Sequence, residues 1–335
     1  MPAERGTVAV TGSAGFIGSH LVDELLARGY RVIGIDNLSM GRRENFQHLA
    51  GRRDFAFHEV DVRDFEALRS ACQESSVIVH LAAYKIPRYG GAIHTLQINS
   101  RGTEHVLEVA RGAGRKVVLA STSDVYGKNP QLPFSERHDS VMGPSSIPRW
   151  SYAVSKLFEE HLGLAYREAY GVPVVILRFF GCYGPRQHRS WWGGPQAVFI
   201  DAMLNGGEIE IHGDGLQTRT FTYVGDTVQG IVRAIECEQA EGEIFNLGSD
   251  EEISILDLAR TIHRLIGRAG EPLIRFVDYA RVGKGPYEDV RRRVPDVTKA
   301  RTMLGFTATV PLIEGLQRAI EWHRQNHAAA VQAHP

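Results

Sequence analysis

Tyr152 and Lys156 are four residues apart in a segment with helical periodicity, so a phenol and an ammonium project from one face of a helix. A free tyrosine is protonated at neutral pH, and a neighbouring cation favours its phenolate, which lowers the pKa of the tyrosine toward working pH. Such a phenolate can remove a proton from a substrate hydroxyl. Taken alone, the spacing also fits a cation–aromatic pair on a helix surface.

Three glycines, Gly12, Gly15 and Gly18, separate a short apolar run from a segment of helical period. The first permits a tight turn, the second lets backbone N–H groups approach a phosphate, and the third lets the helix pack close to the sheet. The N-terminus of that helix presents its positive dipole to a dianionic group. The spacing predicts a turn that binds a pyrophosphate.

A carboxylate, Asp36, ends the next expected strand, roughly 20 residues beyond the glycines. From there it can accept hydrogen bonds from both hydroxyls of a ribose, which favours NAD over NADP. Asp61 and Val62 end the following strand-like segment and are predicted to bracket the adenine. The alternative for Asp36 is an ordinary acidic residue at a strand end.

Segments rich in β-formers alternate with helical segments up to residue 180. The expected strands are 7–11, 31–36, 54–60, 77–81, 116–121 and 173–178, and the expected helices are 16–28, 64–72, 92–113 and 151–170. This alternation predicts an α/β fold with a Rossmann-type doubly wound parallel sheet.

Beyond residue 180 the alternation decays into loops rich in Gly, Pro and Trp. The expected elements are short strands at 208–212, 220–224 and 243–248 and helices at 195–205, 225–238, 254–267 and 312–326. We predict a NAD-binding domain (1–180), a smaller α+β substrate lobe without a parallel sheet of its own (181–326, with some segments returning to the first domain) and a flexible tail (327–335). The cleft for a sugar would lie between the two lobes.

The composition of the chain limits the kinds of partner, metal ion and cellular compartment that we expect. With 335 residues, 43% hydrophobic and 23% charged, the chain is typical of a soluble globular protein, and its net charge of −1 gives no reason to expect nucleic acid or a membrane as partner. The three cysteines and 14 histidines lack the spacing of a metal site, so we expect no metal. Since no apolar signal segment is apparent, a cytoplasmic enzyme is expected.

Further motifs accompany these residues: His80-Leu81-Ala82-Ala83, Asn99-x-x-Gly102-Thr103, Arg178-Phe179-Phe180, Tyr183-Gly184-Pro185-Arg186, Gly213-Asp214-Gly215-x-Gln217-Thr218-Arg219 and Arg292-Arg293-x-Pro295-Asp296. Together with the glycines and the Tyr–Lys pair, they make the chain resemble the extended short-chain dehydrogenases/reductases that act on nucleotide sugars, from about residue 7 to about 325. The resemblance is greatest to UDP-glucose and UDP-glucuronate 4-epimerases.

The resemblance implies roles for these residues. Thr122 would orient the substrate O4, Tyr152 would take its proton, and the C4 hydrogen would pass as hydride to NAD. The implied catalytic set is Thr122, Asp124, Tyr152 and Lys156. The implied cofactor set is Gly12, Gly15, Phe16, Ile17, Gly18, Asp36, Asn37, Asp61, Val62, Leu81, Ala82, Ala83, Lys85, Asn99, Tyr152 and Lys156. The implied substrate set is Lys85, Thr122, Ser123, Gly181, Arg186, Arg219 and one or both of Arg292 and Arg293.

Arginines suit a diphosphate, because a guanidinium can bind phosphate oxygens in pairs. Arg219 and either Arg292 or Arg293 would hold the diphosphate of a UDP-sugar. If the family resemblance is not considered, the run Arg291–Arg293 could equally pair with Glu288 and Asp289 in a solvated cluster.

The residues after Thr122 bear on the reaction. Dehydratases of this group carry an Asp-Glu pair there, whereas this chain has Ser123 and Asp124, which disfavours dehydration. UDP-glucuronate decarboxylases carry a similar Thr-Ser-Glu, which keeps decarboxylation open as the alternative. The segment from Gly143 to Tyr152 and Lys85 resemble epimerases, so we predict a 4-epimerase that holds NAD tightly. The third alternative, a non-catalytic NAD-binding regulator, is disfavoured because Thr122, Tyr152 and Lys156 are intact.

Three further expectations concern the pocket and the assembly. Gly181 replaces an asparagine of many relatives and would widen the pocket. Trp191 and Trp192 either stack on the ligand or pack at a lobe or subunit boundary. The helices at 92–113 and 151–170 resemble those that form a four-helix contact in the family, which predicts a homodimer.

Overall fold

The protein is described by a computed structural model that covers residues 5–85, 91–282 and 287–332, with side chains up to residue 326. Seven parallel strands form one sheet in the order β11–β6–β5–β4–β1–β2–β3. Their bounds are β1 Thr7–Thr11, β2 Arg31–Asp36, β3 Phe55–Glu59, β4 Val77–His80, β5 Lys116–Thr122, β6 Val174–Phe179 and β11 Ile244–Leu247. This confirms the predicted Rossmann-type fold class.

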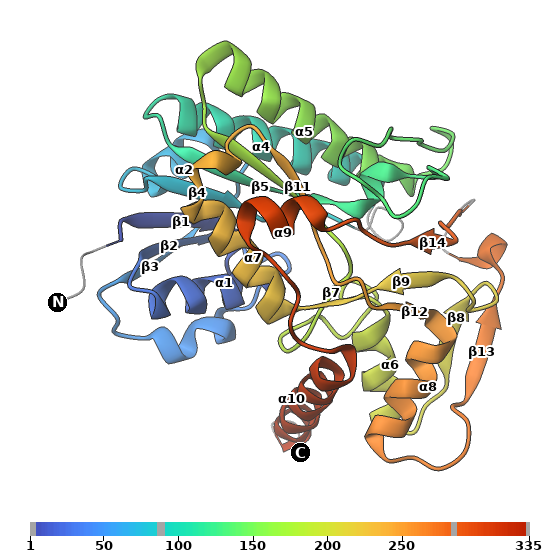
Figure 1. The fold of residues 1–335 in the computed structure, drawn as a ribbon. Helices are drawn as coiled ribbons and strands as arrows, with labels where there is room; N and C mark the ends of the chain where they lie inside the picture. The colour runs from blue at the N-terminus through green and yellow to red at the C-terminus, as the bar shows by residue number, and fades with distance from the viewer. Residues whose placement is uncertain (1–4, 86–90, 283–286, 333–335) are drawn as a thin grey trace.

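Helices cover both faces of this sheet (Figure 1). On one face lie α1 Phe16–Ala27, α7 Val224–Glu236 and α9 Thr298–Leu304, and on the other lie α2 Phe65–Ala71, α4 Ala92–Arg111 and α5 Trp150–Tyr170. Because both faces are covered, the central strands are almost wholly buried and consist of continuous apolar runs such as Val174–Leu177.

A second, smaller lobe lies against the carboxyl ends of the strands (Figure 1). Its helices are α6 Pro195–Leu204, α8 Ile255–Ile266 and α10 Leu312–Gln332. Its strands are β7 Cys182–Tyr183, β8 Ile209–His212, β9 Thr218–Thr220, β10 Thr222–Tyr223, β12 Glu252–Ser254, β13 Ile274–Val277 and β14 Arg292–Arg293. A separate apolar core built around α6, α8 and α10 holds this lobe together.

Some of the later elements return to the first layer, as the prediction allowed, and others differ from the prediction. β11 and the helices α7 and α9 belong to the main sheet and its cover, so parts of 224–247 and 298–304 return to the first layer. The expectation that the lobe has no parallel sheet is wrong, because β8 pairs with β13 in parallel. α10 continues to Gln332 instead of ending at residue 326, and residues 333–335 lie outside the described residues.

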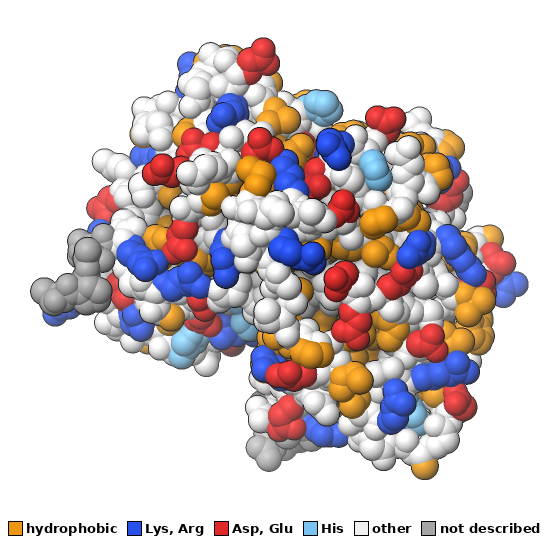
Figure 2. Space-filling model, in the orientation of Figure 1, with side chains coloured by type: hydrophobic (Ala, Val, Ile, Leu, Met, Phe, Trp, Pro, Cys, Tyr) orange, Lys and Arg blue, Asp and Glu red, His pale blue; other side chains and the backbone are white. Residues whose placement is uncertain are grey.

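The surface carries both signs of charge. Figure 2 shows Lys and Arg side chains interspersed with Asp and Glu over the face in view, with apolar side chains scattered between them. Among the helices of the described residues, none has the length and apolar content that a membrane span requires.

Candidate active site

The turn between β1 and α1 can only be built from glycine. Gly12 has a φ of +68°, and a Cβ there would lie 2.8 Å from the backbone nitrogen of Ala82, while a Cβ at Gly18 would overlap the carbonyl oxygen of Gly12. The helix begins at Phe16 after Gly15, so the N–H groups of its first turn have no partner within the helix. This geometry fits a pyrophosphate.

We predict that Gly18→Ala lowers the free energy of unfolding by about 1–3 kcal/mol, since the added methyl must displace backbone, and weakens NAD binding. Urea unfolding and calorimetric titration with NAD test both effects. Gly112→Ala is the control, because Gly112 has a φ of −62° and a Cβ there would lie 3.8 Å from the Glu108 carbonyl oxygen, an ordinary van der Waals distance. Equal stability of the two variants would contradict the prediction.

Asp36 is buried at the end of β2 beside this turn, and is 8% exposed. Burial raises the pKa of its carboxyl, and hydrogen bonds from the backbone N–H groups of Leu38 (2.8 Å) and Ala14 (3.0 Å) oppose that rise. Each carboxylate oxygen accepts one of these bonds and keeps a lone pair for a ribose hydroxyl. Asn37 donates to Asp61 at 2.9 Å, which joins the ends of β2 and β3 where the adenine is expected.

The other residues expected at the cofactor lie around the ends of β1 and β4. The backbone N–H of Leu81 donates to the Thr11 carbonyl at 3.2 Å, and that of Ala82 donates to the Thr11 hydroxyl at 3.3 Å. Asn99 of α4 accepts from the Tyr84 N–H at 2.8 Å and donates to Ser155 at 2.9 Å. Val62 and Ala83 follow the ends of β3 and β4.

The three residues expected to act on O4 come together where β5 ends beside α5. Thr122 ends β5, and its side chain forms a hydrogen bond with the phenol of Tyr152. Lys156 is 2% exposed, and its ammonium donates to the Ala120 carbonyl at 2.8 Å. The same ammonium lies 2.9 Å from a carboxylate oxygen of Glu159.

The pKa of Tyr152 is raised, which differs from the expected effect of Lys156. Burial contributes most to the rise, Asp124 and Glu159 add to it, and only the hydrogen bond with Thr122 opposes it. Burial is the main reason, and the Lys156 ammonium is already paired with Glu159 at 2.9 Å. Among the protein residues described, Lys156 therefore does not bring Tyr152 toward its phenolate.

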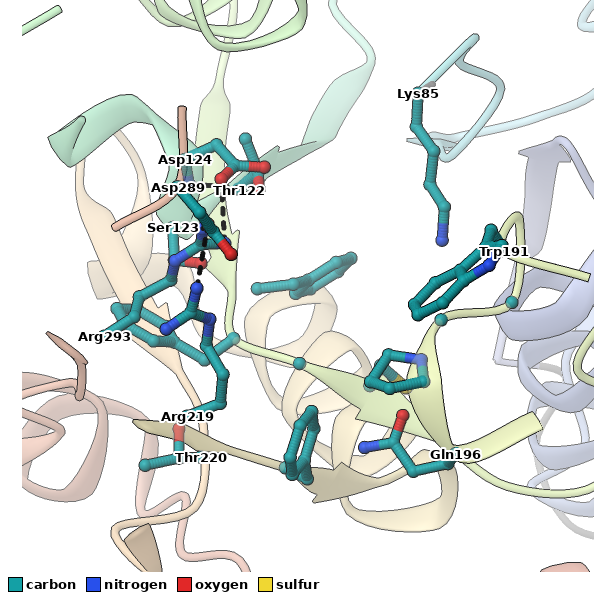
Figure 3. Close-up of a pocket in the computed structure, with 18 of the residues that line it drawn as sticks. Lys85, Thr122, Ser123, Asp124, Trp191, Gln196, Arg219, Thr220, Asp289 and Arg293 are labelled. Atoms are coloured by element: carbon teal, nitrogen blue, oxygen red, sulfur yellow. Dashed lines mark hydrogen bonds and ion pairs between the residues drawn. The ribbon is translucent and has the colours of Figure 1, made fainter. Parts of the chain in front are cut away.

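Two carboxylates and three guanidinium groups form a cluster beside Thr122, and Figure 3 labels Asp124, Asp289, Arg219 and Arg293 of this cluster. Asp124 lies 2.7 Å from Arg293 and 3.6 Å from Arg149. Asp289 lies 2.9 Å from Arg219, 3.1 Å from Arg149 and 3.8 Å from Arg293. Although burial opposes ionisation, Arg219, Arg149 and Arg293 hold the pKa of Asp289 down at about 2. Both carboxylates are therefore ionised, and the cluster keeps one excess positive charge.

A cavity of about 410 Å³ extends from this cluster to Phe16 and Ile17 in the first turn of α1. It is lined by ten of the residues expected from the sequence: Phe16, Ile17, Lys85, Thr122, Ser123, Asp124, Tyr152, Gly181, Arg219 and Arg293. Lys85 and Trp191 lie on the side of the cavity opposite Arg219 and Arg293 (Figure 3). Gln196 lies below Trp191 in this view. Trp191 also stacks on His212 with ring centroids 4.6 Å apart, whereas Trp192 packs edge-on against Tyr84.

Two of the expected substrate residues point elsewhere. Arg292 is half exposed and pairs with Glu252 at 2.8 Å, because successive side chains of β14 point to opposite faces and Arg293 takes the pocket side. Arg186 pairs with Asp23 of α1 at 2.8 Å and does not line the cavity. Of the solvated cluster considered for Arg291–Arg293, the structure shows the Arg293–Asp289 contact, which is largely buried, whereas Arg291 pairs with Asp214 and Arg292 with Glu252.

Gly181 does not widen the pocket as predicted. A Cβ there would overlap the carbonyl oxygen of Thr220 and lie 2.8 Å from the ring of Phe221. The space that a side chain would need is therefore filled by the β9–β10 segment. Gly181 serves the close approach of two backbone segments.

Sequence reasoning missed Arg149 and Asp289 as pocket residues. Arg149 immediately precedes α5 and lies three residues before Tyr152, a spacing that places both on one side of a helix, and this was the available signal. Asp289 gave no signal of its own, because it reaches the pocket only through contacts with arginines from distant segments.

Known proteins share this fold over nearly the whole chain. The UDP-N-acetyl-alpha-D-glucosaminuronate decarboxylase of Bacillus cytotoxicus is 38% identical over 318 residues, which is 94% of this chain and 97% of that protein. The UDP-glucuronic acid decarboxylase 1 of Xenopus tropicalis is 36% identical over 324 residues, 96% of this chain and 73% of that protein.

A solved structure of the UDP-glucuronic acid 4-epimerase of Bacillus cereus, in complex with UDP-glucuronic acid and NAD, has a TM-score of 0.84 and 32% identity, and the match covers 96% of this chain and 99% of that one. The family model described as GDP-mannose 4,6 dehydratase matches residues 9–319. With this match and the glycine turn, Tyr152 and Lys156 in place, the chain belongs to the GDP-mannose 4,6-dehydratase family of extended short-chain dehydrogenases/reductases.

Proposed function

We propose that the chain is a NAD-dependent decarboxylase of a UDP-hexuronate that works through a 4-keto intermediate. The observation that carries the proposal is the cluster of Arg149, Arg219 and Arg293 around Asp124 and Asp289, in the same cavity as Thr122 and Tyr152. A sugar carboxylate and a diphosphate both need such donors. The likeness to two decarboxylases supports the same choice.

The turn of Gly12, Gly15 and Gly18 together with Asp36 would hold NAD, and the chemistry supplied by the cofactor would be reversible hydride exchange with C4 of the sugar. Thr122 holds the O4 hydroxyl, and Tyr152 removes its proton as the C4 ketone forms. The ketone then lies β to the C6 carboxylate, so the C5–C6 bond can break, carbon dioxide leaves, and the electron pair is delocalised as an enolate. C5 next gains a proton, and Tyr152 returns its proton to O4.

Asp124 and the arginines have separate roles in this proposal. Although burial opposes ionisation, Arg293 and Arg149 hold the pKa of Asp124 below its usual value, so Asp124 is a carboxylate at neutral pH. An ionised group cannot donate the proton that C5 gains, so we assign to Asp124 the orientation of the water that supplies it. Overall, one proton is taken from solvent for each carbon dioxide released.

The test is to incubate the purified protein with UDP-glucuronate, UDP-N-acetylglucosaminuronate and UDP-glucose, each with and without added NAD. Products are followed by proton NMR and carbon dioxide is trapped. Release of carbon dioxide with formation of a UDP-pentose supports the decarboxylase. Inversion at C4 without carbon dioxide overturns it and supports the second candidate, the 4-epimerase predicted from the sequence, which the likeness to the Bacillus cereus enzyme favours.

We also infer a homodimer, paired through α4 and α5. Large apolar side chains are exposed on these helices, among them Ile93, Val154 and Phe158, which is 49% exposed. Burying such side chains between two copies would form a four-helix contact.

Phe158→Glu is therefore expected to weaken dimerisation by at least about tenfold, or ~1.4 kcal/mol, because a charge would enter the apolar contact. Size-exclusion chromatography with light scattering over a range of concentrations measures the change. Leu273→Glu is the control, since Leu273 is 65% exposed and belongs to neither helix. A parent protein that is monomeric at every concentration would contradict the inferred dimer.

A further inference from the structure

A buried ion pair lies directly behind Tyr152 and is not used by the mechanism above. The Lys156 ammonium is 2.9 Å from Glu159, three residues further along α5, and both residues are 2% exposed. Glu159 does not line the cavity, so it touches neither the substrate nor the reacting atoms. It is nevertheless in direct contact with the residue that is expected to act on both Tyr152 and the cofactor.

We propose that Glu159 is a positioning residue that fixes the Lys156 ammonium and sets the pH range in which Tyr152 can act as the base. The proposal rests on the proposed function, in which Tyr152 has that role. An ammonium alone would favour a phenolate on Tyr152, but a carboxylate at 2.9 Å cancels much of its field. Glu159 thus keeps the phenol protonated to higher pH than Lys156 alone would allow.

The Lys156 ammonium is held at two points. Besides Glu159, it donates to the Ala120 carbonyl of β5 at 2.8 Å. An ammonium has three N–H donors, so one remains for the cofactor ribose or for Tyr152. Glu159 and Ala120 together fix the direction in which that third donor points.

Several other polar or charged groups face the Lys156–Glu159 pair or Tyr152. His80 of β4 stays neutral, because burial and the Lys156 charge lower the pKa of the imidazole to about 3. Burial raises the pKa of Glu159, and the Lys156 ammonium and the hydroxyl of Thr103 of α4 oppose that rise. Glu160 is paired with Arg178 of β6 at 2.6 Å. Asp124, next to Thr122, raises the pKa of Tyr152 in the same direction as Glu159 and more strongly, and it is unchanged in every Glu159 variant.

The test is Glu159→Gln, which removes the charge and keeps the shape. Tyrosinate formation is titrated by ultraviolet difference absorbance in the NAD-loaded protein, with Tyr152→Phe in the same background as the blank. We expect the titration of Tyr152 to move to lower pH by on the order of one unit, the effect of one nearby charge in a partly buried site. The acidic limb of kcat/KM moves by the same amount. Glu168→Gln, on the exposed end of α5, is the matched control and leaves both unchanged.

A titration that stays in place or moves to higher pH in folded Glu159→Gln overturns the proposal. If the glutamine variant does not fold, the double variant Glu159→Gln with Lys156→Met removes both buried charges and is compared with Lys156→Met alone, in which Glu159 should raise the pH of the Tyr152 titration. Glu159→Asp retains the charge and should return the titration toward that of the parent. If the absorbance titration shifts while the rate profile does not, the effect of Glu159 on Tyr152 stands and the role of Tyr152 as the base fails.

Discussion

Tyr152→Phe is expected to lower kcat by about 10²–10⁴-fold, because it removes the group that takes and returns the O4 proton. NAD binding should be retained, since the glycine turn and Asp36 are separate from the phenol. Turnover of the preferred UDP-sugar and calorimetric titration with NAD measure the two effects. The variant lacks only one hydroxyl, so the cavity keeps its shape.

Near-normal turnover in Tyr152→Phe would refute the assigned base. A matched control is Tyr170→Phe, the same change on the same helix, at a residue that is 54% exposed and packs on Tyr166 and Arg111. It should leave kcat unchanged. Loss of activity in both variants would indicate damage to α5 in general.

Glu160→Gln is expected to lower the free energy of unfolding by about 3–5 kcal/mol, since it leaves a buried guanidinium without its counter-ion. Arg178 of β6 is 5% exposed, and its Nε and one terminal nitrogen donate to the two oxygens of Glu160 at 3.0 Å and 2.6 Å. The pair joins α5 to β6 directly behind the end of β5. Urea unfolding, followed by far-ultraviolet circular dichroism, gives the change.

An exposed ion pair supplies the control for this measurement. Glu314 and Arg318 of α10 are each 49% exposed, so Glu314→Gln should change the free energy of unfolding by less than about 0.5 kcal/mol. If Glu160→Gln costs no more than this control, the α5–β6 pair does not contribute to stability.

The main sheet and the centre of the site could be predicted from the sequence, because residues that are close together along the chain define them. Strands β1 to β6 each contain a short apolar run between clear breaks, and their observed bounds agree with the prediction to within one residue. The two-residue strands β7 and β14 were missed, because two residues carry no periodicity. They exist only through pairing with β10 and β9.

The ionic cluster could not be predicted in the same way. Arg149 and Asp289 are 140 residues apart and meet only when the second lobe folds against the first. Nor could the sequence choose between Arg292 and Arg293, because that choice depends on which face of β14 is turned to the pocket. Gly181 was misjudged because the backbone that fills its place comes from β9 and β10.

The sequence by itself determined what local backbone and spacing control: the glycine turn, the carboxylate at the end of β2, and a phenol and an ammonium on one face of α5. The tertiary structure decided which charges surround them. Arg149, Arg219 and Arg293 collect around Asp124 and Asp289, and Glu159 is buried against Lys156. The physical reason is that the effect of a charged group on its neighbours depends on burial and on side chains from distant segments. Spacing along the chain does not specify either of these.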